Sequence, residues 1–149
     1  MVEAPCGKML IDTGIGNAKQ RPLSPPFNDH DNGFLGRLAA AGVQPDQVGF
    51  ILLTHLHVDH VGWNTIQSDG VWRQTFPNAR YLFSRTEYRF FADPANLSPR
   101  HRNSFLARQD SVDPVVANGQ AEMIEVDGSE VLPGIRFLPP VTARSTPRS

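Results

Sequence analysis

The sequence has little cysteine, no long apolar run and almost no net charge, and each shortage excludes a class of protein. Cys6 is the single cysteine among 149 residues, so it cannot form a disulfide within the chain. No stretch approaches the length of a transmembrane helix, and residues 1–14 lack the charged and apolar regions of a signal peptide. A formal net charge of −1 gives no indication of a nucleic-acid or membrane partner. We therefore expect a cytoplasmic protein with neither partner.

Apolar runs of strand length alternate with segments of helical periodicity, so the sequence predicts an α/β protein. The hydrophobic fraction of 40% and the charged fraction of 19% are those of a globular chain long enough for one domain core. The expected strands occupy residues 9–11, 48–54 and 79–84, with two more within 121–138 joined by a turn at Asp127 and Gly128. The expected helices occupy residues 32–48 and 84–93. The proline-rich segment 18–31 is expected to be a surface loop.

Several side chains have a clear structural interpretation. Asn32 is suited to cap the first helix and Gly42 to end it. Ser84 and Glu87 have the spacing of a capping box at the start of the second helix. Four aromatic residues have a spacing that fits one buried face of a hairpin, and we expect them in the core: Trp72, Phe76, Tyr81 and Phe83.

Three of the five histidines lie in one short stretch, "THLHVDH", at the end of the apolar run "FILLT". His55 and His57 alternate at the end of a strand, so both imidazoles can point the same way, and Asp59 and His60 follow after the chain turns. Imidazole nitrogens and a carboxylate suit Zn²⁺ and also iron or manganese. A chance cluster of surface histidines is the alternative, and it explains a lone histidine better than four ligand-type residues together.

The H-x-H-x-D-H pattern is the signature of the metallo-β-lactamase superfamily, which the sequence resembles well beyond the motif. "LIDTGIGN", "LAAAGVQPDQV", "THLHVDHVGWNT", "GVWRQTFPNARYLFSRTEY", "DSVDPVVANGQAEMIEVD" and "LPGIRFLPP" are similar to one branch of it. That branch contains hydrolases similar to methyl parathion hydrolase and, more distantly, the N-acyl-homoserine lactonases. The resemblance spans Lys8 to Pro140 and implies an αββα sandwich with metals at the sheet edge.

The resemblance also implies a site for two zinc ions in a complete domain, with iron or manganese as alternatives. His55 and His57 would bind the first ion and Asp59 and His60 the second, and Asp59 is also assigned the catalytic role. A metal-bound hydroxide would attack an ester, lactone or phosphotriester bond of a small-molecule substrate.

Three neighbouring residues are expected to support this site. Asp12 in "LIDTG" would lie behind the ligands and orient them, or alternatively form only a turn. Trp63 and Asn64 would shape the pocket floor, with simple core packing as the alternative for Trp63. His30 and His101 are expected to be exposed loop residues, although the segment around His101 could border a substrate pocket.

The family pattern contains ligands that this sequence lacks. Relatives carry a third histidine for the first metal in a segment resembling G-H-T-P-G-H, then a bridging aspartate and a last histidine, whereas no His, Asp or Glu follows Pro140 here. We therefore expect a truncated protein, with mainly the first half of the sandwich at residues 1–140 and a disordered tail at 141–149. Two protein ligands per ion leave half of each tetrahedral coordination shell without a ligand, so zinc binding and hydrolysis are expected to be weak.

Two other functions stay open from the sequence. One is a redox use of the same site, as in persulfide dioxygenases that hold one iron, although "HVGWN" and "TFPNARYLFS" argue against it. The other is a non-catalytic remnant, which the missing ligands favour. Assembly into a homo-oligomer is compatible with all three functions.

We hypothesise that a frameshift explains the abrupt change from "FLPP" to "VTARSTPRS". If residues 140–146 are encoded CCG-GTC-ACG-GCC-CGC-TCC-ACG, a shifted frame reads Gly-His-Gly-Pro-Leu-His, with both histidines at the family's spacing. Sequencing the locus is expected to reveal a G-H-x-P-x-H segment out of frame at these codons. Codons without that segment in a shifted frame would refute the hypothesis.

Overall fold

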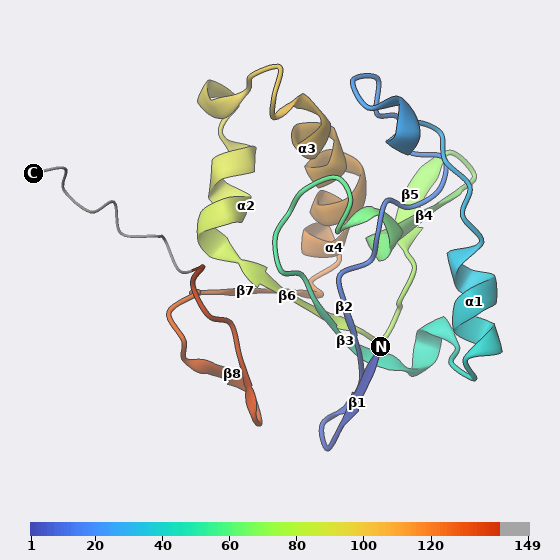
Figure 1. Cartoon of the computed structure of the whole chain (residues 1–149), viewed down its shortest axis with the longest axis vertical. Helices are drawn as coiled ribbons and strands as arrows, with labels where there is room; N and C mark the ends of the chain where they lie inside the picture. Colours follow the sequence, from blue (N-terminus) through green and yellow to red (C-terminus); the bar gives the residue numbers. More distant parts are fainter. Residues whose placement is uncertain (141–149) are drawn as a thin grey trace, which may run out of the picture.

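A computed structural model describes residues 1–140, and its centre is a five-stranded sheet in the order β1-β2-β3-β6-β7 (Figure 1). β1 (Val2–Ala4) pairs antiparallel with β2 (Gly7–Ile11). The remaining pairs are parallel: β2 with β3 (Val48–Leu52), β3 with β6 (Arg80–Ser84), and β6 with β7 (Ala121–Ile124). Parallel strands end at the same edge of a sheet, and the predicted site residues begin where β2 and β3 end.

Helices link the parallel strands, and the chain forms the mixed α/β arrangement that the sequence predicts. α1 (Phe34–Ala40) lies between β2 and β3, while α2 (Arg85–Ala92), α3 (Arg102–Ala107) and α4 (Asp113–Ala117) lie between β6 and β7. A π-helical turn, η5 (Arg108–Val112), joins α3 to α4. Short 3-10 turns are η1 (Pro25–Phe27), η2 (Pro45–Gln47), η3 (Gly62–Asn64) and η4 (Pro94–Asn96).

The main core lies between the sheet and the helices α2, α3 and α4, which cover one of its faces (Figure 1). Apolar side chains of both layers are buried there, among them Ile51, Tyr81, Phe83, Phe91, Phe105 and Val115, and Leu38 of α1 joins the same cluster. Within residues 1–140, no helix combines the length and the apolar composition needed to cross a bilayer. The predicted tail, residues 141–149, and the hypothesis of its shifted frame lie outside the described residues.

A small hairpin of β8 (Glu130–Leu132) and β9 (Ile135–Arg136) packs against the sheet through a second apolar cluster. The chain bends at Asp127 and Gly128 between two strands, as predicted, but the strands on either side of this bend do not pair with each other. β7 pairs with β6 in the sheet, and β8 pairs with β9 around Pro133 and Gly134. Strand propensity marks where a strand lies but does not identify its partner.

The predicted grouping of four aromatic residues is also wrong. Trp72 lies in a separate hairpin of β4 (Thr65–Ser68) and β5 (Val71–Gln74) and is only half-buried. Phe76, Tyr81 and Phe83 are fully buried, but the latter two belong to β6. These side chains therefore share no hairpin face.

The predicted helix signals are confirmed in part, since Gly33 rather than Asn32 is the N-cap residue of α1, and the structure shows only the Ser84 half of the predicted capping box. The Asn32 side chain accepts a hydrogen bond from the backbone of Phe34 at 3.1 Å, and Gly42 has a left-handed φ of 78° just after α1. Ser84 Oγ accepts from the backbone nitrogen of Glu87 at 3.2 Å, which caps α2. The first helix is shorter than predicted, because residues 45–47 form η2 instead.

The segment 18–31 is not the plain surface loop that its composition predicts. The side chains of Lys19 and Arg21 have no exposed surface, and both pair with Asp110. Two guanidinium nitrogens of Arg21 donate to the Asp110 carboxylate at 2.7 and 2.8 Å, and Lys19 Nζ donates to Thr65 Oγ1 at 2.6 Å under the Trp72 ring. Burial lowers the pKa of Lys19 to about 7, and the nearby Asp110 carboxylate opposes that shift.

Replacing Asp110 by Asn is expected to lower the free energy of unfolding by about 3 kcal/mol or more, since the buried guanidinium of Arg21 then loses its carboxylate. The matched control is Glu125→Gln, which removes the exposed pair of Arg85 and Glu125 and should cost less than about 1 kcal/mol. Urea unfolding of the three proteins measures both losses. Equal losses in the two variants would contradict the structural role of Asp110.

Candidate metal centre

The motif loop is held by close backbone contact with the loop that follows β2. Thr13 N donates to the His60 carbonyl at 2.6 Å, and Gly62 N donates to the Gly14 carbonyl at 2.7 Å. A Cβ atom on Gly62 would lie 2.0 Å from the carbonyl carbon of Ile15, so only glycine permits this approach. The contact brings the chain after β2 directly beside the histidines after β3.

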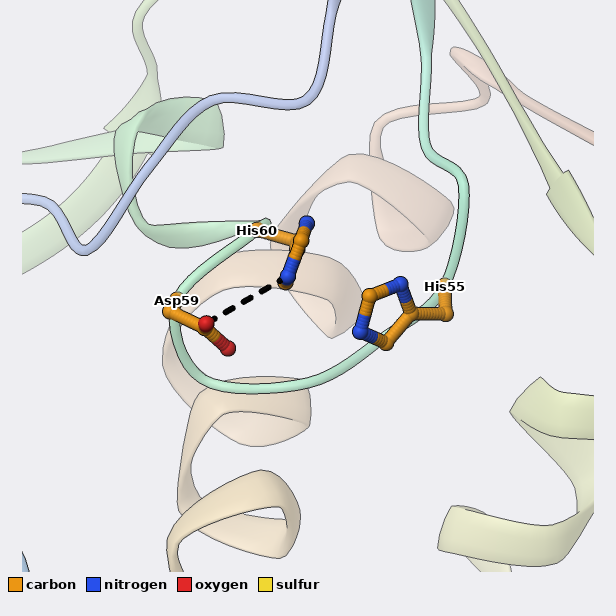
Figure 2. A group of neighbouring side chains, drawn as sticks. All are labelled: His55, Asp59 and His60. Carbon is orange, nitrogen blue, oxygen red and sulfur yellow. Dashed lines mark ion pairs between the residues drawn. The ribbon is translucent and has the colours of Figure 1, made fainter.

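Three of the predicted ligands converge within this loop. His55, Asp59 and His60 each offer one ligand atom, and these atoms lie within 4.8 Å of one another. Figure 2 shows the three side chains facing the space enclosed by the loop, with the ion pair between His60 and Asp59 marked. The two nearest atoms of that pair, His60 Nε2 and Asp59 Oδ2, are 3.4 Å apart.

This geometry fits a divalent metal ion with three protein ligands. Metal–ligand bonds of about 2 Å in tetrahedral geometry separate neighbouring ligand atoms by roughly 3.3 Å, close to the separation of Asp59 and His60. Two imidazoles and one carboxylate form a donor set typical of zinc sites, and a fourth position then stays open, as in catalytic rather than structural sites. The same donors also suit iron and manganese.

His57 lies beside this group without joining it. Its ring centroid is 4.6 Å from that of His55 and 5.9 Å from that of Phe91, and its side chain is exposed. The grouping differs from the expected division into one pair of histidines and one Asp–His pair. Because the loop curls back after His57, His55 lies closest to the ligands that follow, and its ring centroid is 3.8 Å from that of His60.

Asp12 connects two of the converging imidazoles through one carboxylate. Its Oδ2 lies 2.8 Å from His60 Nδ1 and accepts a hydrogen bond from Thr54 Oγ1 at 2.7 Å. Thr54 Oγ1 in turn lies 3.1 Å from His55 Nδ1. If both Nδ1 atoms carry the proton, as this network requires, both Nε2 atoms are free to bind a metal.

The environment favours the neutral, metal-binding form of His55 and His57, because it lowers the pKa of both imidazoles. Burial lowers the pKa of His55, and the neighbouring His60 lowers it further. Burial likewise lowers the pKa of His57, with an added contribution from His55. A proton therefore competes less with a metal ion at these imidazoles than at a free histidine.

Trp63 and Asn64 lie in the protein interior rather than on a pocket floor. Trp63 stacks on Phe34 at 5.3 Å between ring centroids and donates from Nε1 to Asn32 Oδ1 at 3.0 Å. Asn64 is fully buried and accepts a hydrogen bond from Thr13 Oγ1 at 2.9 Å. Neither residue lines the two cavities that adjoin the motif, so their contact with the site passes through Thr13 and the backbone.

Two cavities adjoin the motif. One of about 500 Å³ is mostly apolar and touches His55, with Ile11, Leu52 and Phe137 among its walls. The other, of about 380 Å³, is more polar and touches His57, Asp59 and His101. His101 is half-buried rather than a fully exposed loop residue, and so is His30.

Three residues near the site were not singled out from the sequence. Thr13 and Thr54 both form hydrogen bonds with residues of the motif loop. Thr13 follows Asp12 and Thr54 precedes His55, and this adjacency is the signal that could have identified them. Glu87 was noted only as a helix cap, yet it lines the apolar cavity beside His55. Burial raises the pKa of its carboxyl group, while the Leu56 backbone and the neighbouring His57 oppose the shift.

A family model described as the metallo-beta-lactamase superfamily matches residues 1–147. The chain belongs to this superfamily. Its fold agrees, since the α/β architecture matches solved structures of the same superfamily. The hydrolase AbOPH of the beta lactamase superfamily is 32% identical, with a TM-score of 0.59 over 83% of this chain and 40% of that one. The dizinc quorum-quenching lactonase AidC is 22% identical, with a TM-score of 0.59 over 86% of this chain and 42% of that one.

Relatives in sequence include proteins named N-acyl homoserine lactonase. The one called AttM from Agrobacterium fabrum is 29% identical in an alignment 106 positions long that covers 63% of this chain and 36% of that protein. The one from Bacillus thuringiensis is 25% identical in an alignment 150 positions long that covers 93% of this chain and 50% of that protein. The chain thus spans between about a third and a half of the length of these relatives.

Asp12→Asn is expected to weaken Zn²⁺ or Co²⁺ binding by about 10- to 100-fold, because the amide no longer orients the imidazoles as a charged acceptor. Asn tolerates the left-handed φ of 56° at this position, so the backbone is unstrained. The control is Asp69→Asn, at an aspartate with a similar φ of 51° in the turn between β4 and β5. Titration followed by Co²⁺ absorption compares the affinities. Equal affinity in the two variants would show that Asp12 only forms a turn.

Proposed function

We propose that this protein is a metal-dependent hydrolase that opens lactones. The convergence of His55, Asp59 and His60 is the observation that carries the proposal, since it provides three ligands and an open position. Relatives named N-acyl homoserine lactonase and the solved hydrolases of the same superfamily support it. Esters and phosphotriesters are the other substrates that the same chemistry can cleave.

The four motif residues have separate roles in this proposal. His55 and His60 would hold the metal through Nε2 and Asp59 through Oδ2, while Asp12 and Thr54 keep the two imidazoles in their metal-binding orientation. His57 would serve as a further ligand beside His55. A divalent ion bound here, zinc in the first instance, would supply Lewis acidity and lower the pKa of water.

Asp59 is the residue to which we assign the catalytic role. It lines the polar cavity as well as belonging to the converging group, so its carboxylate faces both the metal position and a bound small molecule. Oδ1 of Asp59, which would not bind the metal, could accept a proton on the side of the polar cavity. This is the position from which water or a leaving alcohol would be contacted.

The cavities are of the size that small-molecule substrates occupy, which is roughly 300–1,000 Å³. The apolar cavity beside His55 suits a hydrocarbon arm, and the polar cavity beside Asp59 suits a charged or hydrogen-bonding group. We therefore propose a substrate with one arm of each kind, with its scissile bond between them.

Turnover of a lactone by the zinc-loaded chain is expected to be slow compared with rates of 1–10³ s⁻¹ typical of enzymes, and to be lost on chelation. His60→Gln is expected to lower the rate by more than about 100-fold, since it removes a metal ligand rather than a supporting partner. His30→Gln is the control, because His30 lies outside the cluster. Ring opening is followed by proton release in a weakly buffered solution.

Two results would contradict the proposal. A rate that persists after chelation, or that is equal in the His60 and His30 variants, would exclude metal-dependent hydrolysis at this group. Oxygen uptake by the iron-loaded chain with a persulfide substrate, without lactone opening, would instead favour the redox use of the site. Absence of both activities in a protein that binds metal would favour a non-catalytic role.

A further inference from the structure

The polar cavity has walls from three separate parts of the chain. Leu23 and Ser24 come from the segment before η1, and the motif loop contributes residues 57–59. The third wall is formed by residues 99–101, which lead into α3, and by Asn103 and Ser104 in its first turn. Its volume is about 380 Å³. No residue that lines it lines the apolar cavity as well, so the two are distinct compartments beside the motif.

The cavity is preformed. Asn103 is only 8% exposed, and its Nδ2 donates to Ser24 Oγ at 2.8 Å. This hydrogen bond joins two walls that are far apart in the sequence, and both residues line the cavity. A ligand would therefore meet an existing space rather than one that it must open.

His101 is held with one ring nitrogen engaged and the other available. Its Nδ1 lies 3.3 Å from the Asn96 carbonyl, and its ring meets those of Phe90 and Phe91 edge-on, with centroids at 5.3 and 6.1 Å. A proton on Nδ1 satisfies the carbonyl, which leaves Nε2 for a group in the cavity. These contacts restrict the imidazole on several sides, as recognition of a ligand requires.

The charges around the cavity favour an anion. Arg100 carries a permanent positive charge, and His57 and His101 add two imidazoles that can donate hydrogen bonds. Asp59 is the carboxylate among the lining residues, and its Oδ2 lies 3.4 Å from His60 Nε2, on the side of the proposed metal. A bound metal would offset this one negative charge, and the remaining lining residues are positive or neutral.

We propose that the polar cavity binds a carboxylate of the substrate remote from its scissile bond, with Arg100 and His101 as the residues that determine this specificity. The inference rests on the proposed function, since it names the substrate class of the same site: esters or lactones that carry a free carboxylate. A planar guanidinium binds a carboxylate through two parallel hydrogen bonds, and His101 adds a third donor at Nε2 when its imidazole takes up a proton as the carboxylate binds.

The test measures binding apart from turnover. Monomethyl glutarate, an ester with a free carboxylate, is titrated against the zinc-loaded chain, in which the charge of Asp59 is offset by the metal, and the variants below distinguish binding in the cavity from binding through the metal. Histidine imidazole signals in NMR spectra report the occupancy, and dimethyl glutarate is the neutral comparison. Arg100→Gln and His101→Gln are expected to weaken binding of the monoester about tenfold or more. Arg102→Gln and His30→Gln, outside this cavity, should leave it unchanged.

Saturable binding of the monoester that these two variants weaken would support the proposal. Equal binding of monoester and diester, loss in the control variants as well, or binding of neither would overturn it. The result is separable from the proposed function. Binding of the monoester without turnover of any ester by the zinc-loaded chain refutes only the hydrolase, whereas turnover of neutral lactones without binding of the monoester refutes only the carboxylate specificity.

Discussion

The carboxylate of Asp12 is the contact on which the candidate site depends. It is placed directly after β2 and accepts hydrogen bonds from the backbone and hydroxyl of Thr54, directly after β3, at 2.8 and 2.7 Å. It also meets His60 Nδ1 at 2.8 Å. The Asp12 carboxylate therefore connects the ends of β2 and β3 to His60, near the end of the motif loop. Without it, the loop would keep its histidines but not their common direction.

Backbone contact makes this arrangement rigid. Gly62 allows the motif loop to lie against Ile15 and Gly16 at a distance that no side chain permits. The hydrogen bond between the buried side chains of Thr13 and Asn64 further connects the loop after β2 to the end of the motif loop. Trp63 and Asn64, which were predicted to line a pocket, thus support the site from the interior. The surfaces open to a small molecule belong to the two cavities, one beside Ile11 and Phe137 and the other beside Ser24 and His101.

Buried charged residues fix the segment 18–31, which its composition predicts to be an exposed loop. Asp110 draws Lys19 and Arg21 into the interior, where Trp72 covers the lysine. This pairing fixes the start of the segment that later provides Ser24 to the polar cavity. The proline-rich segment 18–31 therefore has a defined path, because Lys19 and Arg21 pair with the carboxylate of Asp110. Asp110 belongs to η5, far from this segment in the sequence.

The sequence alone determined what depends on neighbouring residues. The runs that form β2, β3 and β6, the cap provided by Ser84 and the H-x-H-x-D-H motif are all local patterns, and the family is identified by the resemblance of the motif and its flanking segments to known sequences. Tertiary structure decided which partners meet: β7 beside β6 rather than β8, Lys19 beneath Trp72, and His55 with Asp59 and His60 rather than with His57 alone. The physical reason is that local propensity is set by adjacent side chains, whereas burial, pairing and metal-like geometry arise between segments that only the folded chain brings together.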